Sequence, residues 1–364
     1  SKTDTEALKE LGELGAMGMV VPEEWGGAGM DYMSLVLTLE EIAAGDGATS
    51  TIVSVQNSLP CGITLKYGSE AQKKEWLIPL ARGEKLGCFC LTEPHTGSDA
   101  SALTTRADRE GDDFVLNGVK QFITTGKNAD MAIVLAVTDK TAGKKGISCF
   151  LVPTNTPGFI VTRIEEKMGI HGSPTCVMRF DEAQGWLVGE VGKGLNAMFV
   201  MMNAARLGVG MQSLGLTEVA YQNALAYAKD RLQMRSLSGP KAPDKEADPI
   251  IVHPDVRRNL LRQKVMIEGC RALAYFTGLH ADIAHSHEDA GVRQQADDLV
   301  LSMNRAAEAA APEAKQLLVD AVKKMSVQDA KGIISGGQDS GTQFFKSKTS
   351  DTLRTKFLPV VRSE

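Results

Sequence analysis

The sequence has no long apolar run and no excess of positive charge. A helix needs about 20 predominantly apolar residues to cross a membrane, and no segment of the chain reaches that length. The N-terminus lacks the pattern of a signal peptide. With 45 acidic and 40 basic residues the net charge is −5, so no basic footprint points to nucleic acid or an anionic membrane surface. We therefore expect a cytoplasmic protein that binds neither.

The six cysteines form no Cys-x-x-Cys pair and no even disulfide framework. They stand at positions 61, 88, 90, 149, 176 and 270. This pattern predicts reduced thiols, as in the cytoplasm. A metal site is not predicted, because Cys88 and Cys90 have no partner ligands nearby in the sequence. His285 and His287 lie two residues apart, which is the wrong spacing for one helix face.

The chain alternates between helical and strand-rich stretches. Apolar residues recur at helical spacing over about 5–83, and long helical segments are expected at about 194–232 and 253–286. Over about 86–180, short β-branched and aromatic runs are broken by Gly, Asn and Asp. The clearest strand candidates are 112–125, 131–137, 147–153 and 158–164. A Pro- and charge-rich loop at 235–249 separates the two long helical segments.

This order predicts an α+β multidomain fold. We expect an N-terminal all-α domain at 1–85, a middle antiparallel β-barrel-like domain at 86–190, and the first part of a C-terminal α-helical bundle at 191–295. A seam falls near Ala296, where the sequence becomes richer in Ala and Lys. We treat 296–364 as a helical segment of unrelated character.

Two strand ends carry the polar residues of greatest interest. CFCLTEPHTGSD at 88–99 is a strand that runs into a polar turn, where Thr92, Thr96 and Ser98 and the backbone around Gly97 offer several donors. The turn is either a cradle for a phosphate or a flavin edge, or a well-capped hairpin turn. KQFITTG at 120–126 ends another strand and is either a ring-stacking and hydrogen-bonding site or ordinary turn chemistry.

Two weaker signals lie outside the strands. GEVGKG at 189–194 is glycine-rich but does not sit between a strand and a helix of a βαβ unit, so no dinucleotide fingerprint is predicted. The Met-rich run at 198–211 reads as core filling, with Arg206 as its exception. A guanidinium in an apolar stretch needs an anionic or carbonyl partner, so Arg206 is either a ligand contact or a structural ion pair.

Four strings together resemble the acyl-CoA dehydrogenase family. In order, they are VPEEWGGAGMDY (21–32), LTEPHTGSDAS (91–101), LNGVKQFITTGKNAD (116–130) and KMGIHGSPT (167–175). The likeness covers about residues 5–298, and four ordered motifs are far more specific than one. It implies FAD as cofactor, an acyl-CoA substrate, an electron-transfer flavoprotein as electron acceptor, and a homo-oligomer. The fold it implies is a helical domain, a middle β-domain and a four-helix C-terminal domain.

The resemblance also implies roles for individual residues at the strand ends. Phe89, Leu91 and Thr92 would line the flavin ring and its carbonyl and N5 edge. Phe122 would lie against the isoalloxazine, and Thr124 would hydrogen-bond its N5 region.

Further roles fall on the polar turn and on the first long helical segment. Gly97 and Ser98 would meet the FAD pyrophosphate or the thioester ligand. Arg206 matches an arginine near the substrate thioester, and Arg231 matches one that reaches FAD across a subunit interface. Both ligand groups need donors, because the diphosphate is anionic and the thioester oxygen gains charge as the α-proton leaves.

One part of the family's chemistry has no counterpart in the sequence. A glutamate removes the α-proton in this family, commonly from a late Tyr-Glu-Gly-type loop, and no such string occurs in the chain. A minority of members place the base on the helix immediately before the matching arginine, and that position is Ala205. The late glycine motif that packs on the FAD adenosine is absent as well.

The departure coincides with the seam near residue 296. The first 170 residues resemble short-chain members, whereas about 172–300 resembles a longer branch that includes enzymes acting on methylmercaptopropionyl-CoA. The tail resembles a bacterial family of small helical proteins of unknown function. The sequence therefore predicts a mosaic chain that is either an active acyl-CoA dehydrogenase, or a catalytically silent flavin- or acyl-CoA-binding protein or fragment without the catalytic glutamate.

Overall fold

The computed structural model describes residues 3–302 and short stretches at 320, 323–326, 328–329, 344 and 347–348. The chain forms two compact units, Ser1–Leu279 and His280–Glu364. Most of the expected fourth segment, 296–364, lies outside the described residues. In the second unit, residues 290–302 are helical.

The N-terminal region is helical, as expected. Its helices are α1 (Thr5–Glu13), α2 (Tyr32–Gly45), α3 (Gly47–Gln56), α4 (Gly62–Tyr67), α5 (Glu70–Gln72) and α6 (Ile78–Ala81), joined by 3₁₀ turns η1 (Ala16–Gly18) and η2 (Glu23–Trp25) and π-helical turns η3 (Asn57–Cys61) and η4 (Lys73–Leu77). Aspartates cap the first three helices: Asp4, Asp31 and Asp46 each accept from a backbone N–H in the first turn.

Seven strands and two 3₁₀ turns form the middle region. They are β1 (Gly87–Cys90), η5 (Ala100–Ala102), β2 (Arg106–Glu110), β3 (Asp113–Thr124), β4 (Met131–Val137), η6 (Lys140–Gly146), β5 (Ile147–Pro153), β6 (Phe159–Ile164) and β7 (Thr175–Leu187). The strand order is β1-β4-β2-β3-β7-β5, with β6 on β7 and an additional pairing of β4 with β5. The middle β region is confirmed, while its barrel-like character stays a prediction.

The sheet is not purely antiparallel, contrary to expectation. Its long ladders β3–β7, β4–β5 and β6–β7 are antiparallel, but β1 and β2 both run parallel to β4. A tight hairpin forces antiparallel pairing, and neither of these pairs is joined by one. Instead, β1 leads into a long polar turn before β2, which leaves its direction against β4 unconstrained.

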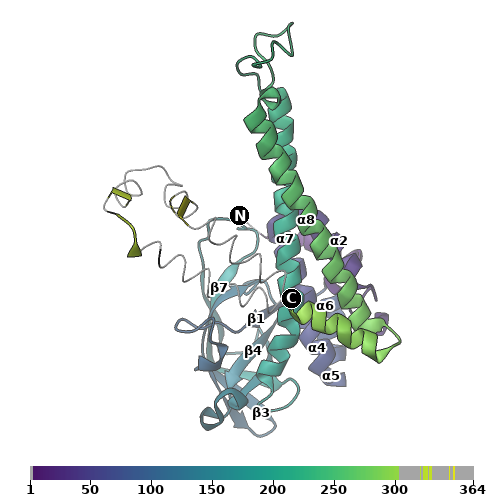
Figure 1. Cartoon of the computed structure of the whole chain (residues 1–364). Coiled ribbons are helices and arrows are strands. Elements are labelled where there is room, and N and C mark those ends of the chain that lie inside the picture. The colour runs from purple at the N-terminus through teal and green to yellow at the C-terminus, as the bar shows by residue number, and fades with distance from the viewer. Residues whose placement is uncertain are drawn as a thin grey trace. The chain divides into compact units, whose positions relative to one another are not determined.

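Two long helices follow the sheet, α7 (Gly194–Asp230) and α8 (Pro254–Ser286), with the 3₁₀ turn η7 (Ile250–Val252) between them. Figure 1 shows α7 running past both the sheet and α2. Glycines permit the close approach of α7 to the N-terminal helices: a Cβ on Gly208 would lie 2.0 Å from Ser54 Oγ, and one on Gly215 would lie 2.5 Å from the Glu40 carbonyl oxygen. These contacts seat α7 on α2 and α3.

The core divides into three apolar clusters. One lies within the sheet around Phe114, Leu116 and Phe150, and one lies among the N-terminal helices and α7 around Leu39 and Met211. The third joins η3, η4 and α6 to β4, β5 and the start of α7. The ends of β1 and β3 therefore lie on a sheet that is packed against helices.

Candidate functional site

The end of β1 meets the end of β3. The backbone N–H of Gln121 donates to the Thr92 carbonyl oxygen over 2.8 Å, and Lys120 Nζ donates to the Leu91 carbonyl oxygen over 3.0 Å. These two bonds join stretches of chain that lie about thirty residues apart. The structure thus brings together the two polar strand ends that the sequence singles out.

A β-bulge turns Phe122 out of the sheet. Between Lys120 and Ile123, β3 has one residue more than its partner β7, and Phe122 adopts a φ of 60°. The left-handed region is unfavourable for a bulky side chain, so local backbone strain is present here. The ring of Phe122 is 58% exposed instead of packed in the core. An aromatic surface therefore stands beside the Leu91–Thr92 segment.

A buried ion pair lies beneath this edge. Lys120 Nζ is 2.8 Å from Glu93 Oε1, and the side chains are 0% and 1% exposed. Glu93 also accepts from the Thr104 N–H and hydroxyl, both at 2.8 Å, and from the Thr105 N–H at 3.0 Å. Burial alone would raise the pKa of Glu93, but the Lys120 charge and these hydrogen bonds outweigh it and lower the pKa to about 2.

The polar turn after β1 is closed by its own hydrogen bonds and open at its tip. Glu93 and Thr96 exchange backbone hydrogen bonds of 2.9 and 3.1 Å, and Thr96 Oγ1 donates to the Asp99 carbonyl oxygen over 2.5 Å. Gly97 and Ser98 are exposed. A Cβ added at Gly97 would meet only a Thr92 methyl group, at 3.7 Å. The turn is capped, and its tip leaves room for a ligand.

Hydroxyl groups gather at the far end of β3. Thr124 is half-buried and pairs with Thr175 of β7. The next residue, Thr125, is buried with a φ of 64°, and its N–H donates to the Pro174 carbonyl oxygen over 2.8 Å. The hydroxyls of Thr125 and Ser173 are buried without a hydrogen-bond partner in the described structure. Unpaired buried hydroxyls of this kind suit a polar ligand or ordered water.

The remaining sequence-predicted residues lie elsewhere on the chain. Phe89 lies within β1 and is half-buried against the cluster that joins sheet and helices. Ala205 is half-buried and Arg206 is exposed on α7. Arg231 is exposed at the C-cap of the same helix. A rise of 1.5 Å over 25 helical residues separates Arg206 from Arg231 by about 37 Å. The two arginines therefore lie far apart along the helix in one copy of the chain.

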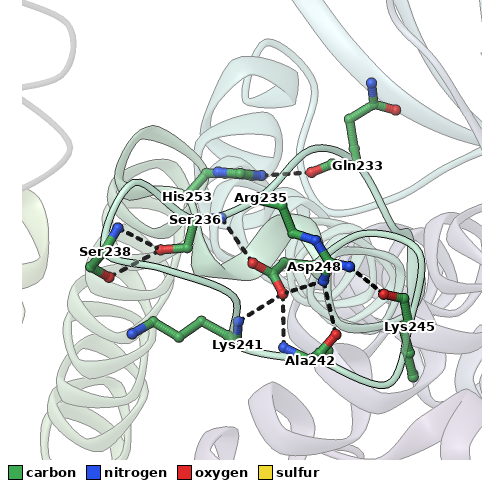
Figure 2. Close-up of polar contacts among 9 residues, drawn as sticks. All are labelled: Gln233, Arg235, Ser236, Ser238, Lys241, Ala242, Lys245, Asp248 and His253. Carbon is green, nitrogen blue, oxygen red and sulfur yellow. Dashed lines mark hydrogen bonds and ion pairs between the residues drawn. The ribbon is translucent and has the colours of Figure 1, made fainter.

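Arg231 begins a loop that a single carboxylate holds closed. The side chain of Asp248, fully buried, accepts from the backbone N–H groups of Ser236, Lys241 and Ala242 at 2.7–2.8 Å (Figure 2). It also pairs with Arg235 at 3.3 Å. The N–H of Ser236, ahead of the other groups, lowers the pKa of Asp248 to about 2.

Sequence reasoning missed several of these features. The motifs named above contain Lys120, Glu93, Thr125 and Ser173, but they do not predict the buried ion pair or the burial of the two hydroxyls. No motif named above predicts the Asp248 loop closure. The described residues contain no cluster of metal-ligating side chains. Among them, too, no helix is long and apolar enough to cross a membrane.

Family models match almost the whole chain. Acyl-CoA dehydrogenase N-terminal, middle and C-terminal domain models match residues 1–84, 88–183 and 192–321. A model for a protein of unknown function, DUF4197, matches residues 279–364 and overlaps the last of these. The match of the tail to a family of unknown function agrees with the resemblance found in the sequence.

Relatives and solved structures agree with the family models. The chain is 43% identical over 228 residues to the mitochondrial short-chain specific acyl-CoA dehydrogenase of Homo sapiens, a match that covers 62% of this chain and 55% of that enzyme. It therefore spans about half the length of that relative. The butyryl-CoA dehydrogenase structure from Megasphaera elsdenii superposes with a TM-score of 0.72 at 35% identity, covering 85% of this chain and 79% of that one.

A glutaryl-CoA dehydrogenase from Mycobacterium smegmatis, solved in complex with FADH2, gives a TM-score of 0.70 at 33% identity and covers 86% of this chain and 75% of that one. The motifs, the order of helical and strand-rich regions, the three domain models and these superpositions all lead to one assignment. The chain belongs to the acyl-CoA dehydrogenase family.

Proposed function

We propose that the chain binds FAD at the joined ends of β1 and β3 and oxidises a fatty acyl-CoA thioester at its α,β-bond, with electrons passing to an electron-transfer flavoprotein. The observation that carries the proposal is the convergence of Leu91 and Thr92 with the outward-turned Phe122. Membership of the family and the likeness to a protein solved with FADH2 support the choice of cofactor.

The donor set at these strand ends suits a flavin. Phe122 offers an exposed aromatic surface, and Thr124 and Thr125 offer hydroxyls at the end of the same strand. Gly97 and Ser98 stand at the open tip of the turn, where backbone and hydroxyl donors can meet a diphosphate. When bound, FAD supplies the acceptor for the hydride that leaves the β-carbon.

Substrate would be held by the helix side of the site. Arg206 brings a cation on α7, and Ser98 is exposed at the turn. A donor placed at the thioester oxygen stabilises the charge that develops as the α-proton leaves. Arg231, about 37 Å away along α7, would serve the flavin of a second copy, so we propose that the chain works as a homo-oligomer.

The proton acceptor of the family has no counterpart at its expected positions in the sequence. Ala205 occupies the position where some family members carry a glutamate. Glu93, the buried carboxylate at the strand ends, is a poor substitute because its pKa of about 2 and its three anchoring groups keep it ionised and engaged. This favours a second candidate function, a flavin- and acyl-CoA-binding protein that does not turn over.

Absorbance of the purified chain separates the two candidates. We expect a yellow protein whose flavin remains bound through gel filtration. Addition of a short-chain acyl-CoA alone should then bleach the flavin, and an artificial electron acceptor added afterwards should take up the electrons and restore the yellow colour. A yellow protein that acyl-CoA does not bleach supports the silent binder. A chain that stays colourless and does not take up added FAD contradicts both.

A further inference from the structure

Lys120 is an unusual residue to find inside a sheet. It is among the largest fully buried side chains of the described protein, so its ammonium group is not in contact with solvent. Burial of an ammonium group is costly unless the charge is paired and hydrogen-bonded. Burial also lowers the pKa of Lys120, and the charge of Glu93 acts against that shift.

The pair connects three stretches of chain. Through Nζ, Lys120 holds the Leu91 carbonyl oxygen at 3.0 Å and Glu93 Oε1 at 2.8 Å. Through its other oxygen, Glu93 holds Thr104 by both its N–H and its hydroxyl. The end of β1, the segment leading into β2 and the bulge of β3 are thereby tied to one buried centre. The His95 ring also lies close to the pair, with Nε2 3.7 Å from Glu93 Oε2.

These bonds fix the direction of two peptide units at the site. The carbonyl groups of Leu91 and Thr92 are both directed at β3, the first by Lys120 and the second by the N–H of Gln121. A peptide unit just beyond the end of a strand has no ladder to hold it. Without Lys120, the Leu91 carbonyl would lose its partner, and the segment next to Phe122 would gain rotational freedom.

We propose that Lys120 and Glu93 are positioning residues for the flavin, which set the Leu91–Thr92 backbone and the Phe122 ring at fixed places relative to each other. The proposal rests on the FAD site proposed above. Neither side chain reaches the ligand in it, since both are enclosed. Their effect is preorganisation: the edge is already rigid before FAD arrives, so less ordering entropy is lost on binding.

The alternative is that the pair only stabilises the sheet. A buried ion pair can often be replaced by uncharged groups with little loss of stability, which makes the two roles separable. The double variant K120M/E93Q leaves no buried charge but removes the ammonium bond to the Leu91 carbonyl. Its thermal midpoint without flavin reports the structural role, and its dissociation constant for FAD reports the positioning role.

We expect K120M/E93Q to weaken FAD binding by about tenfold or more, the equivalent of one lost hydrogen bond of about 1.4 kcal/mol. Flavin fluorescence quenching on titration with the apoprotein measures this, and the absorption band of the bound flavin should shift. The matched control is Glu40→Gln, which alters another buried, paired carboxylate. It should leave FAD affinity unchanged. FAD affinity of K120M/E93Q within about twofold of wild type would overturn the proposal.

A milder variant covers the case in which the double variant does not fold. Thr104→Val keeps both charges and removes only the hydroxyl bond to Glu93. Its dissociation constant for FAD should rise a few-fold, and Thr104→Ser, which keeps the hydroxyl, should restore it. Equal affinity in Thr104→Val and wild type would also contradict the proposal. If wild type itself binds no FAD, the proposed cofactor site fails first, and this inference with it.

Discussion

The strand ends and the long helices each contain an ion pair, one fully buried and the other partly exposed, and the two are built differently. In the sheet, Lys120 has a single carboxylate partner, and both side chains are excluded from solvent. On the helices, Arg271 of α8 meets Glu40 of α2 at 2.8 Å, Glu218 of α7 at 2.7 Å and Glu268 at 3.1 Å, and it keeps 20% of its surface exposed.

The difference indicates where the loss of one ion-pair partner should destabilise the protein most. Loss of Lys120 leaves the enclosed Glu93 carboxylate with neutral donors from Thr104 and Thr105 in place of a cation. The helical cluster has several charged partners, and Arg271 is partly exposed. The hydrogen bond to the Glu218 carboxylate, followed by those to Glu40 and Glu268, raises the pKa of Arg271. Arg271 therefore stays charged. The helical cluster therefore tolerates change that the strand ends do not.

The sheet and α8 also differ in how much of their apolar surface is covered. In the sheet, Leu116, Phe150 and Met178 are fully enclosed. On α8, by contrast, Leu261 and Val265 are 63% and 62% exposed within the described structure. The interior of the sheet is thus enclosed, whereas α8 presents apolar side chains to solvent within the described structure.

The sharpest test of this comparison is a pair of charge-to-methionine variants. Lys120→Met should lower the free energy of unfolding by about 3–5 kcal/mol, because it strands a buried carboxylate. Arg271→Met should cost about 1–3 kcal/mol, because the carboxylates it leaves retain partners or solvent. Urea denaturation followed by circular dichroism measures both. An Arg271→Met variant that loses as much stability as Lys120→Met breaks the comparison.

Ala205→Glu asks whether the helix side lacks only a proton acceptor. If the site is otherwise intact, we expect flavin reduction by a short-chain acyl-CoA to accelerate at least about a hundredfold, since a general base contributes about 10²–10⁴ in rate. Stopped-flow absorbance of the bound flavin measures the rate. Ala204→Glu, one residue earlier and on a different helix face, is the matched control. A folded, flavin-loaded Ala205→Glu chain with no gain removes the idea.

The smallest effect is expected at Thr124. Thr124→Val keeps the shape of the side chain and removes its hydroxyl, so FAD affinity should fall by about tenfold at most and the flavin spectrum should shift. Gel filtration with absorbance detection measures retention of the flavin. Thr162→Val, which alters an exposed hydroxyl on β6, is the control. An unchanged spectrum and unchanged retention would contradict the role assigned to Thr124.

Much of the fold could be predicted, because its elements are long and strongly patterned. The runs 131–137 and 147–153 match β4 and β5 residue for residue, and 112–125 differs from β3 by one residue at each end. The long helical segments likewise agree with α7 and α8 to within two residues. The strand candidates do not include β2 or β7, because charged residues, and in β7 also a glycine, interrupt the apolar pattern.

The geometry of the site was harder to predict, although a signal was present. Phe114 and Leu116 share one face of β3 by their spacing of two, and the same spacing places Lys120 on that inner face. Ile123 is also buried, which breaks the alternation and marks the bulge. A lysine in a strand is ordinarily exposed, so composition argued against the burial that occurs. Its partner Glu93 lies far away in sequence, beyond the reach of any local pattern.

The hydrogen bonds of Asp248 affect how flexible the loop between α7 and α8 is. A Pro- and charge-rich stretch with Lys241 and Lys245 would ordinarily serve as a flexible tether that proteases such as trypsin cut readily. Here the Lys241 N–H and the Lys245 carbonyl group are both engaged, by Asp248 and by Arg235. Cleavage requires the chain to unfold into an extended form, so we expect the hydrogen bonds from Lys241 to Asp248 and from Arg235 to Lys245 to slow proteolysis at both sites.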